Sequence, residues 1–503
     1  MAIALIERAV GFGDRIAVVD GHGSSSYRQL LAASARMAGG LLAGEDDLGQ
    51  RRVAFLVPPT ADYVALQWAI WRAGGIAVPL CLSHPEPELE YVITDCRADL
   101  LVASVDRLER LAPIADRLGC KLKSTTDLLA SAPVELPRID SGRAAMIVYT
   151  SGTTGGPKGV VTSHDNISAQ IESLVEAWEW RADDRILLVL PLHHVHGIIN
   201  VLGCALWAGA TCEMMPRFDA AAVWEGFARG GLSLFMAVPT IYARLARAWE
   251  EADAATQERW TRASGNLRLM VSGSAALPEQ LFERWRQIGG HTLLERYGMT
   301  EIGMALSNPL HGRRLPGHVG TPLPGIDVRR VDSGARPLAP NEPGEIEVCG
   351  RGVFTHYWDR PEETAASFRQ GWFRTGDVAV VERGSYRILG RQSVDIIKTG
   401  GFKVSGLEIE EVLRRHPQIR ECAVVGLPDA EWGERVAVAV VVEGEQPPAL
   451  ESLREWSKQR LAPYKAPSRL LVLEELPRNP MGKVTKPEIK RLFAAAADDS
   501  ALS

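Results

Sequence analysis

Short apolar runs alternate with Ala- and Leu-rich segments through the first 300 residues of the chain. The runs of strand length lie at residues 16–19, 52–57, 75–80 and 100–103, and the segments with helical spacing at 27–42 and 60–72. Strand, helix and strand at this spacing indicate an α/β architecture with parallel strands. The pattern starts again at Arg185, with strands expected at 186–190, 234–238 and 267–271, which predicts a second α/β layer.

The pattern changes twice in the last part of the chain. Between residues 317 and 390, β segments punctuated by Gly and Pro replace the helices, which indicates a small barrel or sheet. After Arg391, two helices and two strands are expected within about 110 residues, enough for a separate domain. We therefore predict two domains, 1–391 and 392–503, with an α/β fold: a large N-terminal domain of layered α/β subdomains plus a small β subdomain, followed by a small mobile α+β C-terminal lid domain.

The composition narrows the classes of function. Hydrophobic residues make up 46% and charged residues 23% of 503 positions, a balance typical of globular proteins. A formal net charge of −6 argues against nucleic acid as a partner, because phosphate backbones require a concentrated basic face. No run of about 18 apolar residues occurs, so we expect no membrane span.

The seven cysteines are scattered and include no Cys-x-x-Cys pair. We therefore expect reduced, mostly packed thiols rather than a disulfide framework or a zinc site. At the N-terminus, Arg8, Asp14 and Arg15 interrupt the apolar run, so no signal peptide is expected. These features predict a cytoplasmic protein.

A loop rich in hydroxyls and glycines follows the apolar run 144–149 and carries one lysine, Lys158. Glycines let backbone N–H groups approach an anion, hydroxyls donate hydrogen bonds, and the lysine supplies positive charge, so the loop suits a polyphosphate. The Walker A pattern does not fit, because Pro157 stands where its second glycine belongs. A flexible turn with a solvated lysine is the alternative. The candidate phosphate ligands are Thr150, Ser151, Gly152, Thr153, Thr154 and Lys158.

The twelve residues 149–160 resemble the AMP-binding loop of the adenylate-forming superfamily, which includes acyl-CoA synthetases, firefly luciferase and peptide-synthetase adenylation domains. Residues 296–301, Arg-Tyr-Gly-Met-Thr-Glu, look like its second signature. The resemblance implies that Tyr297 faces the adenine, Thr300 contacts phosphate and Glu301 coordinates Mg²⁺. Without the resemblance, this stretch fits a turn that caps a helix, with Thr300 as the N-cap. Ser274, in a turn of small residues, is expected to line the adenine and acyl pocket.

Three later elements continue the resemblance in the family's order. Asp377 and Arg391 look like the pair that binds the ribose, although a surface Asp/Arg pair in a turn is the ordinary alternative. Lys483 resembles the catalytic lysine of adenylation, and the resemblance implies that residues Gly400, Gly401, Phe402 and Lys403 face coenzyme A. One residue more than the usual spacing separates Arg391 from Asp395, which leaves Ser393 and Val394 as alternative hinge residues.

Arg296 is the residue that indicates most about which carboxylic acid would be the substrate. A guanidinium in an apolar fatty-acid pocket would be costly unless it were paired, whereas the second carboxylate of a short diacid could pair with it. The alternative is an internal pair with Glu295. The surrounding segments resemble malonyl-CoA synthetases of the mitochondrial type, which implies that Arg296 holds the distal carboxylate and His194 lines or gates the pocket. Ser274, Gly303 and Met304 are expected as pocket walls, and Met304 as the residue that separates malonate from methylmalonate.

Together, the motifs predict an ATP-dependent ligase that adenylates malonate or methylmalonate, transfers it to coenzyme A, and releases AMP and pyrophosphate. The expected ligands are the small carboxylic acid, ATP, Mg²⁺ and coenzyme A. Three alternatives remain open: a CoA synthetase for a monocarboxylic acid, an adenylation enzyme that loads a carrier protein, and an inactive nucleotide-binding protein. The sequence leaves the oligomeric state open.

Overall fold

The computed structural model describes residues 3–150, 157–444, 446–479 and 482–501. The chain divides into two compact units. Unit 1 comprises Met1–Leu315, Gly320–Val328 and Val348–Phe373, and unit 2 comprises Pro316–Val319, Arg329–Glu347 and Arg374–Ser503. The predicted fold class is confirmed, since a large N-terminal α/β body precedes a smaller C-terminal one. The predicted boundary after Arg391 stays a prediction, because compactness does not identify the point about which two domains turn.

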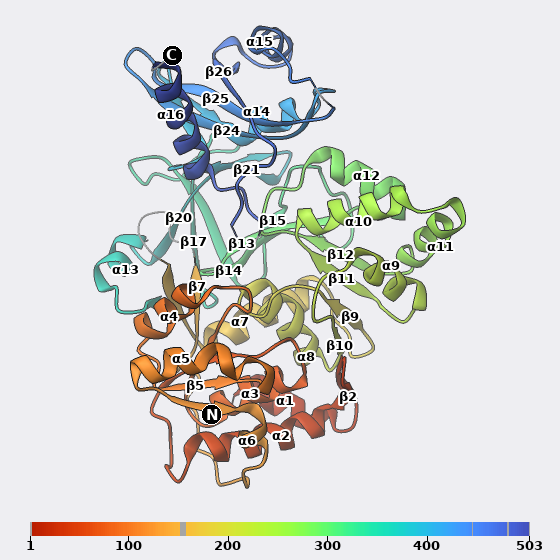
Figure 1. Cartoon of the computed structure of the whole chain (residues 1–503), viewed down its shortest axis with the longest axis vertical. Helices are drawn as coiled ribbons and strands as arrows, with labels where there is room; N and C mark the ends of the chain where they lie inside the picture. The colour runs from red at the N-terminus through yellow and green to blue at the C-terminus, as the bar shows by residue number, and fades with distance from the viewer. Residues whose placement is uncertain (1–2, 151–156, 445, 480–481, 502–503) are drawn as a thin grey trace. The chain divides into compact units, whose positions relative to one another are not determined.

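Unit 1 contains a nine-stranded sheet in which six central strands pair in parallel and antiparallel strands form both edges (Figure 1). Its order is β15 (Thr321–Pro322), β14 (Gly303–Ser307), β13 (Leu294–Met299), β12 (Leu269–Ser272), β11 (Leu234–Ala237), β9 (Arg185–Leu188), β10 (Thr211–Met214), β1 (Ile16–Asp20) and β2 (Gly23–Ser26). The predicted parallel α/β layer is therefore present.

A second, seven-stranded sheet of unit 1 carries the phosphate-loop strands. Its order is β18 (His356–Tyr357), β8 (Lys158–Ser163), β7 (Ala144–Thr150), β4 (Ile76–Pro79), β3 (Arg52–Leu56), β5 (Leu100–Ala103) and β6 (Lys121–Ser124). The strands from β7 to β6 pair in parallel, whereas β7 and β8 form an antiparallel hairpin. The hairpin replaces the strand-to-helix connection of a Walker A loop.

Several helices of unit 1 begin after a residue whose side chain accepts a hydrogen bond from one of their first N–H groups. Ser26 starts α2 and Ser163 starts α7, each with a reciprocal hydrogen bond from the third helical residue. The helices are α1 (Ala4–Phe12), α2 (Tyr27–Leu42), α3 (Ala61–Arg72), α4 (Glu86–Asp95), η1 (Val105–Arg107), α5 (Leu108–Leu118), α6 (Thr125–Leu129), α7 (His164–Ala177), η2 (His196–Gly203), α8 (Cys204–Ala208), α9 (Ala220–Arg229), α10 (Pro239–Glu251), α11 (Ala254–Ser264), α12 (Glu279–Gly289) and α13 (Pro361–Ser367). Within the described ranges, no helix combines the length and apolarity that a bilayer crossing needs.

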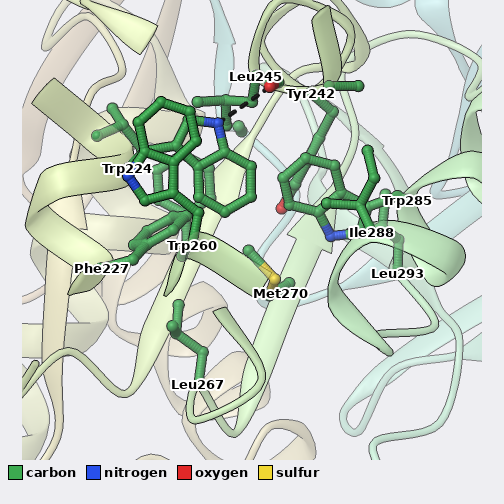
Figure 2. Packing of buried hydrophobic residues seen from close by; sticks show 14 of the residues in the cluster. Trp224, Phe227, Tyr242, Leu245, Trp260, Leu267, Met270, Trp285, Ile288 and Leu293 are labelled. Atoms are coloured by element: carbon green, nitrogen blue, oxygen red, sulfur yellow. Dashed lines mark hydrogen bonds between the residues drawn. The ribbon is translucent and has the colours of Figure 1, made fainter. Parts of the chain in front are cut away.

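An aromatic core fixes the strands that carry the candidate site. Trp224 stacks on Trp260 and Trp285 at ring-centroid distances of 5.4 and 5.7 Å, and its indole N–H donates to the Leu245 carbonyl over 3.0 Å (Figure 2). The cluster joins α9, α10, α11 and α12 to β11 and β12. Truncating one such tryptophan to alanine typically costs about 3–5 kcal/mol of stability, so this core holds the ends of β11 and β12 firmly.

Unit 2 ends in a five-stranded sheet that consists of β23 (Phe402–Ser405), β22 (Ile396–Thr399), β25 (Gly433–Val442) and β24 (Ile419–Asp429), with β26 (Arg469–Val472) also on β25. Its helices are α14 (Gly406–Leu413), α15 (Leu450–Lys458), η3 (Pro463–Lys465) and α16 (Lys486–Ala501). The predicted small β region is also present as a sheet of β16 (Ile326–Val331), β17 (Gly344–Gly350), β20 (Trp372–Glu382) and β19 (Phe368–Arg369), with β21 (Ser385–Arg391) on β20.

Candidate active site

The candidate phosphate loop connects the two strands of the β7–β8 hairpin. Thr150, the last residue of β7, lies opposite Lys158, the first residue of β8. Gly159 beside it has no room for a side chain, because a Cβ there would lie 2.8 Å from Ile147 and 3.2 Å from Trp358. The candidate ligands Ser151, Gly152, Thr153 and Thr154 lie outside the described residues. The structure therefore places the two ends of the loop, with its lysine at one end.

Lys158 connects the loop to the second signature through an aromatic residue. Its ammonium forms an ion pair with Glu363 and lies 5.5 Å from the centre of the Tyr357 ring. The Tyr357 hydroxyl donates to Glu301 Oε1 over 2.9 Å, and the Glu301 side chain is buried. The structure thus brings Lys158 and Glu301 to the same tyrosine, although 143 positions separate them in the sequence.

The second signature forms a β-hairpin and does not cap a helix. Tyr297 belongs to β13, Thr300 and Glu301 form the turn, and β14 returns with Gly298 opposite Met304. The alternative in which Thr300 caps a helix is therefore wrong. Gly298 is required at this crossing, since a Cβ would lie 2.1 Å from the Gly303 carbonyl oxygen. The hairpin presents a ring, a hydroxyl and a carboxylate at its tip.

Arg296, on β13, is a buried cation with 3% of its surface exposed. Its guanidinium lies against the backbone of Gly273, where an added Cβ would come within 2.4 Å of Cζ. Among the described residues no carboxylate forms an ion pair with it, so the alternative of an internal pair with Glu295 is not supported. Burial lowers the pKa of Arg296 to about 9, so it is charged at neutral pH.

Ser274 connects Arg296 to the histidine-rich loop. Arg296 Nη2 donates to Ser274 Oγ over 3.3 Å, and Ser274 Oγ lies 3.1 Å from His196 Nδ1. Ser274 has a φ of +71°, a left-handed conformation that is strained for a serine and that sets the direction of its hydroxyl. His196 begins η2, which is a π-helix, a helical form often found at functional sites. Arg296, Ser274 and His196 therefore form one polar chain.

The other predicted pocket residues lie on the same elements. Gly303, with a φ of +61°, faces Gln170, whose Cδ would be 2.4 Å from an added Cβ. Met304 is buried against Gly298, within 2.6 Å of the position of a Cβ there. The His194 ring packs on His193 at 4.1 Å between centroids, whereas His196 is the histidine in contact with Ser274. The predicted pocket role of His194 stays a prediction, and the sequence interpretation did not select His196.

In unit 2, the predicted ribose pair lies across neighbouring strands. Asp377 on β20 pairs in register with Arg391 on β21, and Arg391 Nε donates to Asp377 Oδ1 over 3.2 Å. Thr375 orients the strand, because its hydroxyl accepts from the Asp377 N–H over 3.1 Å and donates to the Ile346 carbonyl over 2.8 Å. The sequence spacing therefore identified a true neighbouring pair, and its ribose-binding role stays a prediction.

The candidate CoA segment is the turn between β22 and β23. Gly400 and Gly401 both have positive φ, +55° and +82°, as a tight hairpin turn requires. A Cβ on Gly400 would lie 2.9 Å from the Trp432 ring. Phe402 follows, 51% exposed, and stacks on Tyr464 at 4.2 Å, while Lys403 pairs with Lys398 across the hairpin. An exposed aromatic surface therefore borders the turn.

Lys483 lies in a loop that Asn479 closes. The Lys483 N–H donates to Asn479 Oδ1 over 3.0 Å, and the Asn479 N–H donates to the Lys483 carbonyl over 2.9 Å. Arg478 and Val484 form an isolated bridge beside it. The candidate hinge residues Ser393 and Val394 lie in the turn that follows Arg391.

The sequence interpretation missed several residues that the structure places at these sites. Tyr357 and Glu363 had no motif to single them out, because their role comes from strand pairing. Gly273 stood in the predicted turn of small residues, but its close approach to Arg296 was not predicted. His196 had a partial signal, since it is one of three histidines within four positions, but nothing in the sequence distinguished it from His194.

The chain is similar to ligases of known description. It is 47% identical to the mitochondrial malonate–CoA ligase ACSF3 of Mus musculus, over 98% of this chain and 91% of the relative. The corresponding ligase of Homo sapiens is also 47% identical, over 97% of this chain and 91% of the relative. The expectation of a cytoplasmic protein is contradicted by these relatives, whose names place them in mitochondria.

The fold is also similar to that of a solved enzyme. The ATP-bound crystal structure of MatB from Rhodopseudomonas palustris matches with a TM-score of 0.90 at 34% identity, over 98% of this chain and 99% of MatB. The profile of the AMP-binding enzymes matches residues 5–358, and that of the AMP-binding enzyme C-terminal domain matches residues 408–483. The motifs, the sheets that carry them and these matches agree, and the chain belongs to the AMP-binding enzyme family.

Proposed function

We propose that this protein is an ATP-dependent malonate–CoA ligase of the AMP-forming type. In the first step, a malonate carboxylate attacks the α-phosphate of ATP, and pyrophosphate leaves. In the second step, the thiol of coenzyme A attacks the malonyl adenylate, which gives the thioester and AMP. The named relatives, the ATP-bound structural neighbour and the family support this assignment.

The observation that carries the choice of acid is the buried charge of Arg296. A buried cation normally has a carboxylate partner, because the loss of hydration costs several kcal/mol. Arg296 has none among the described residues, and the Ser274 hydroxyl gives it only partial compensation. The distal carboxylate of malonate would supply the counter-charge as a charge-assisted pair, worth about 1.5–3 kcal/mol. Ser274 and His196 would complete this end of the pocket, with His194, Gly303 and Met304 as further lining.

ATP would be held mainly by the phosphate loop. Thr150, Ser151, Gly152, Thr153 and Thr154 would donate hydrogen bonds to the phosphates, and Lys158 would exchange Glu363 for a phosphate oxygen. Tyr297 would stack on the adenine and Thr300 would contact the α-phosphate. This exchange explains why Lys158 has an exposed carboxylate as its present partner, since such a pair contributes little stability and is easily replaced.

Glu301 suits Mg²⁺. Its carboxylate is buried and fixed by the Tyr357 hydroxyl, and carboxylate oxygen is the ligand this ion prefers. No group of three or more metal-binding side chains occurs among the described residues, which agrees with an ion held by one carboxylate together with phosphates and water. When bound, Mg²⁺ would neutralise charge on the phosphates. Glu301 would orient it, and Tyr357 would hold Glu301.

Unit 2 would supply the remaining contacts. Asp377 and Arg391 would bind the ribose, and Lys483 would stabilise the negative charge that develops at the α-phosphate. The C-terminal domain would then rotate about Ser393 or Val394. This rotation would move Lys483 out of the site and bring in the segment Gly400, Gly401, Phe402 and Lys403, where the two glycines would leave room for pantetheine.

A substrate panel tests the proposal. Pyrophosphate release in the presence of ATP, Mg²⁺ and coenzyme A is measured with malonate, propionate, octanoate and benzoate. Propionate is the matched control, because it replaces only the distal carboxylate of malonate by a methyl group. We expect a kcat/KM for malonate about 10–150-fold above that for propionate, as the loss of one charge-assisted pair predicts. Preference for any monoacid would overturn the choice of malonate.

A further inference from the structure

A cluster of a thiol and two imidazoles lies in unit 1 outside the residues assigned to ligation. Cys81 follows β4 and lines a pocket of about 180 Å³ together with Pro191, Leu192, His193 and Arg217. Only 4% of its surface is exposed, so the pocket is its route to solvent. Cys81 Sγ lies 3.2 Å from Ser83 Oγ, which fixes the direction of the sulfur.

Two histidines from different elements converge on this sulfur. The rings of His84 and His193 lie 6.0 Å apart, and His193 lines the same pocket as Cys81, which stands three positions before His84 in the sequence. Burial would raise the pKa of this thiol, but the nearby His193 and His84 imidazoles outweigh it and lower the pKa to about 5. The same contact with Cys81 raises the pKa of His84, as expected when a thiolate and an imidazolium stabilise each other.

The charged groups around the cluster favour this arrangement. Glu88 on α4 lies 3.3 Å from His84 Nε2 and supports its positive charge. Arg110 on α5 donates to the carbonyls of Leu82 and His84 over 2.5 Å each, which fixes the segment that carries both. Arg217 lines the same pocket. No described group of three or more such residues has metal-binding geometry, so a zinc site is not supported.

The buried cysteines elsewhere in the chain have the opposite environment. Burial raises the thiol pKa of Cys96 to about 12 and that of Cys422 to about 12. It also raises the pKa of Cys204 and Cys212. For Cys96 and Cys422 burial outweighs the attraction of nearby cations, and a thiol whose pKa is raised in this way is inert, so these four are internal controls for Cys81.

We propose that Cys81, His84 and His193 form a reactive-thiol site at which a small disulfide that enters the pocket makes a mixed disulfide with Cys81. The Cys81 sulfur attacks one sulfur of the disulfide, a new S–S bond forms, and the original S–S bond breaks. The departing thiolate takes a proton from water. The proton of Cys81 is already on an imidazole, and an added thiol reverses the reaction.

The first test uses glutathione disulfide as the probe and the intact protein. After incubation and digestion without a reductant, mass spectrometry gives the fraction of each cysteine that carries glutathione. We expect modification of Cys81 ahead of Cys96, Cys204, Cys212 and Cys422, and its reversal by dithiothreitol. Equal modification of these five residues, or none at Cys81, would overturn the proposal.

The second test is the pH profile of alkylation by iodoacetamide, which separates ionisation from mere access. For an ordinary thiol with a pKa near 8.5, the fraction present as thiolate falls about 75-fold from pH 8 to pH 6. Cys81 is expected to change its rate by less than about threefold over the same range, because it stays ionised. A profile that follows an ordinary thiol would contradict the site even if Cys81 were accessible.

Variants connect the profile to the two imidazoles. His84→Gln keeps the size of the side chain but removes the cation, so the midpoint of the Cys81 profile should move above pH 6. Cys349→Ser, outside the cluster, should leave the profile unchanged. Circular dichroism checks that each variant is folded, and an unchanged midpoint in a folded His84→Gln variant would exclude its part in the site.

Discussion

Each unit of this protein has a buried cation, and the two have opposite surroundings. In unit 2, Lys486 at the start of α16 lies 2.6 Å from Asp395 Oδ1 and 2.7 Å from Glu410 Oε1. In unit 1, Arg296 has the Ser274 hydroxyl and, among the described residues, no carboxylate. Lys486 therefore has two carboxylates as counter-charges, whereas Arg296 has none among the residues that the structure describes.

The pKa directions follow this difference. Burial would lower the pKa of Lys486, but attraction to Glu410 and Asp395 outweighs it and raises the pKa. For Arg296 burial acts alone and lowers the pKa to about 9. This difference separates Lys486, which stabilises the fold, from Arg296, which we propose binds a ligand, because only a cation without a counter-charge gains free energy when an anion binds.

The largest expected effect is on Lys486. Lys486→Met leaves Asp395 without its cation and the buried Glu410 with Arg414 alone, so the affected part of unit 2 should lose about 3–5 kcal/mol of stability. Hydrogen exchange of the amides of β24 and β25 measures this loss locally. Lys490→Met is the matched control, since its ammonium lies 3.8 Å from Glu434 at a partly exposed position and should contribute less than about 1 kcal/mol. Equal effects of the two substitutions would contradict the comparison.

Arg296→Met should show the reverse pattern. The kcat/KM for malonate should fall about 10–150-fold, as one charge-assisted pair predicts. Thermal unfolding should occur at the same or a higher temperature, because an apolar side chain replaces a buried, uncompensated charge. Pyrophosphate release and a melting curve measure the two quantities on one preparation.

Arg268→Met supplies the control for that variant. Arg268 forms a bidentate pair with Asp184, with hydrogen bonds of 2.8 and 2.5 Å. Arg268 precedes β12, whereas Ser274, the partner of Arg296, follows the other end of that strand. Without Arg268, the buried Asp184 carboxylate has no cation beside it, so the melting temperature should fall. The preference for malonate over propionate should stay unchanged. If Arg296→Met destabilised the protein as Arg268→Met does, Arg296 would be a structural cation.

Gly273→Ala tests the position of the guanidinium without removing it. The φ of Gly273 is not in the left-handed region, so alanine strains no backbone there, but its Cβ would lie 2.4 Å from Arg296 Cζ. Displacement of the guanidinium should lower kcat/KM for malonate about tenfold, within the 1–3 kcal/mol typical of overpacking. Gly265→Ala, with its nearest atoms at 3.5 Å, should leave the activity unchanged.

The sequence predicted those parts of the site that depend on local pattern. The strand before the phosphate loop follows from an apolar run, and β7 extends it by one residue to Thr150. The Asp377 and Arg391 pair was expected from the resemblance to the family, and a hairpin of β20 and β21 brings these two residues into register. Both predictions needed only residues that are close in the sequence.

The missed features depend on contacts between distant segments. Gly273 and Arg296 approach each other because β12 and β13 are parallel neighbours, and the sequence does not specify that register. Tyr357 reaches Glu301 through an edge strand that pairs with β8. His196 rather than His194 contacts Ser274 because the π-helix begins there, and helical pitch cannot be read from three histidines.

The smallest expected effect is at Ser274, where two substitutions separate the hydroxyl from the backbone. Ser274→Ala and Ser274→Gly both remove the oxygen that accepts from Arg296, so both should lower kcat/KM for malonate by about 2–12-fold, the equivalent of one hydrogen bond. They differ in strain, because only glycine adopts the φ of +71° freely, which should make the glycine variant about 1 kcal/mol more stable. Full malonate activity in either variant would remove Ser274 from the chain that orients Arg296, whereas equal losses despite unequal melting temperatures would assign the effect to the hydroxyl.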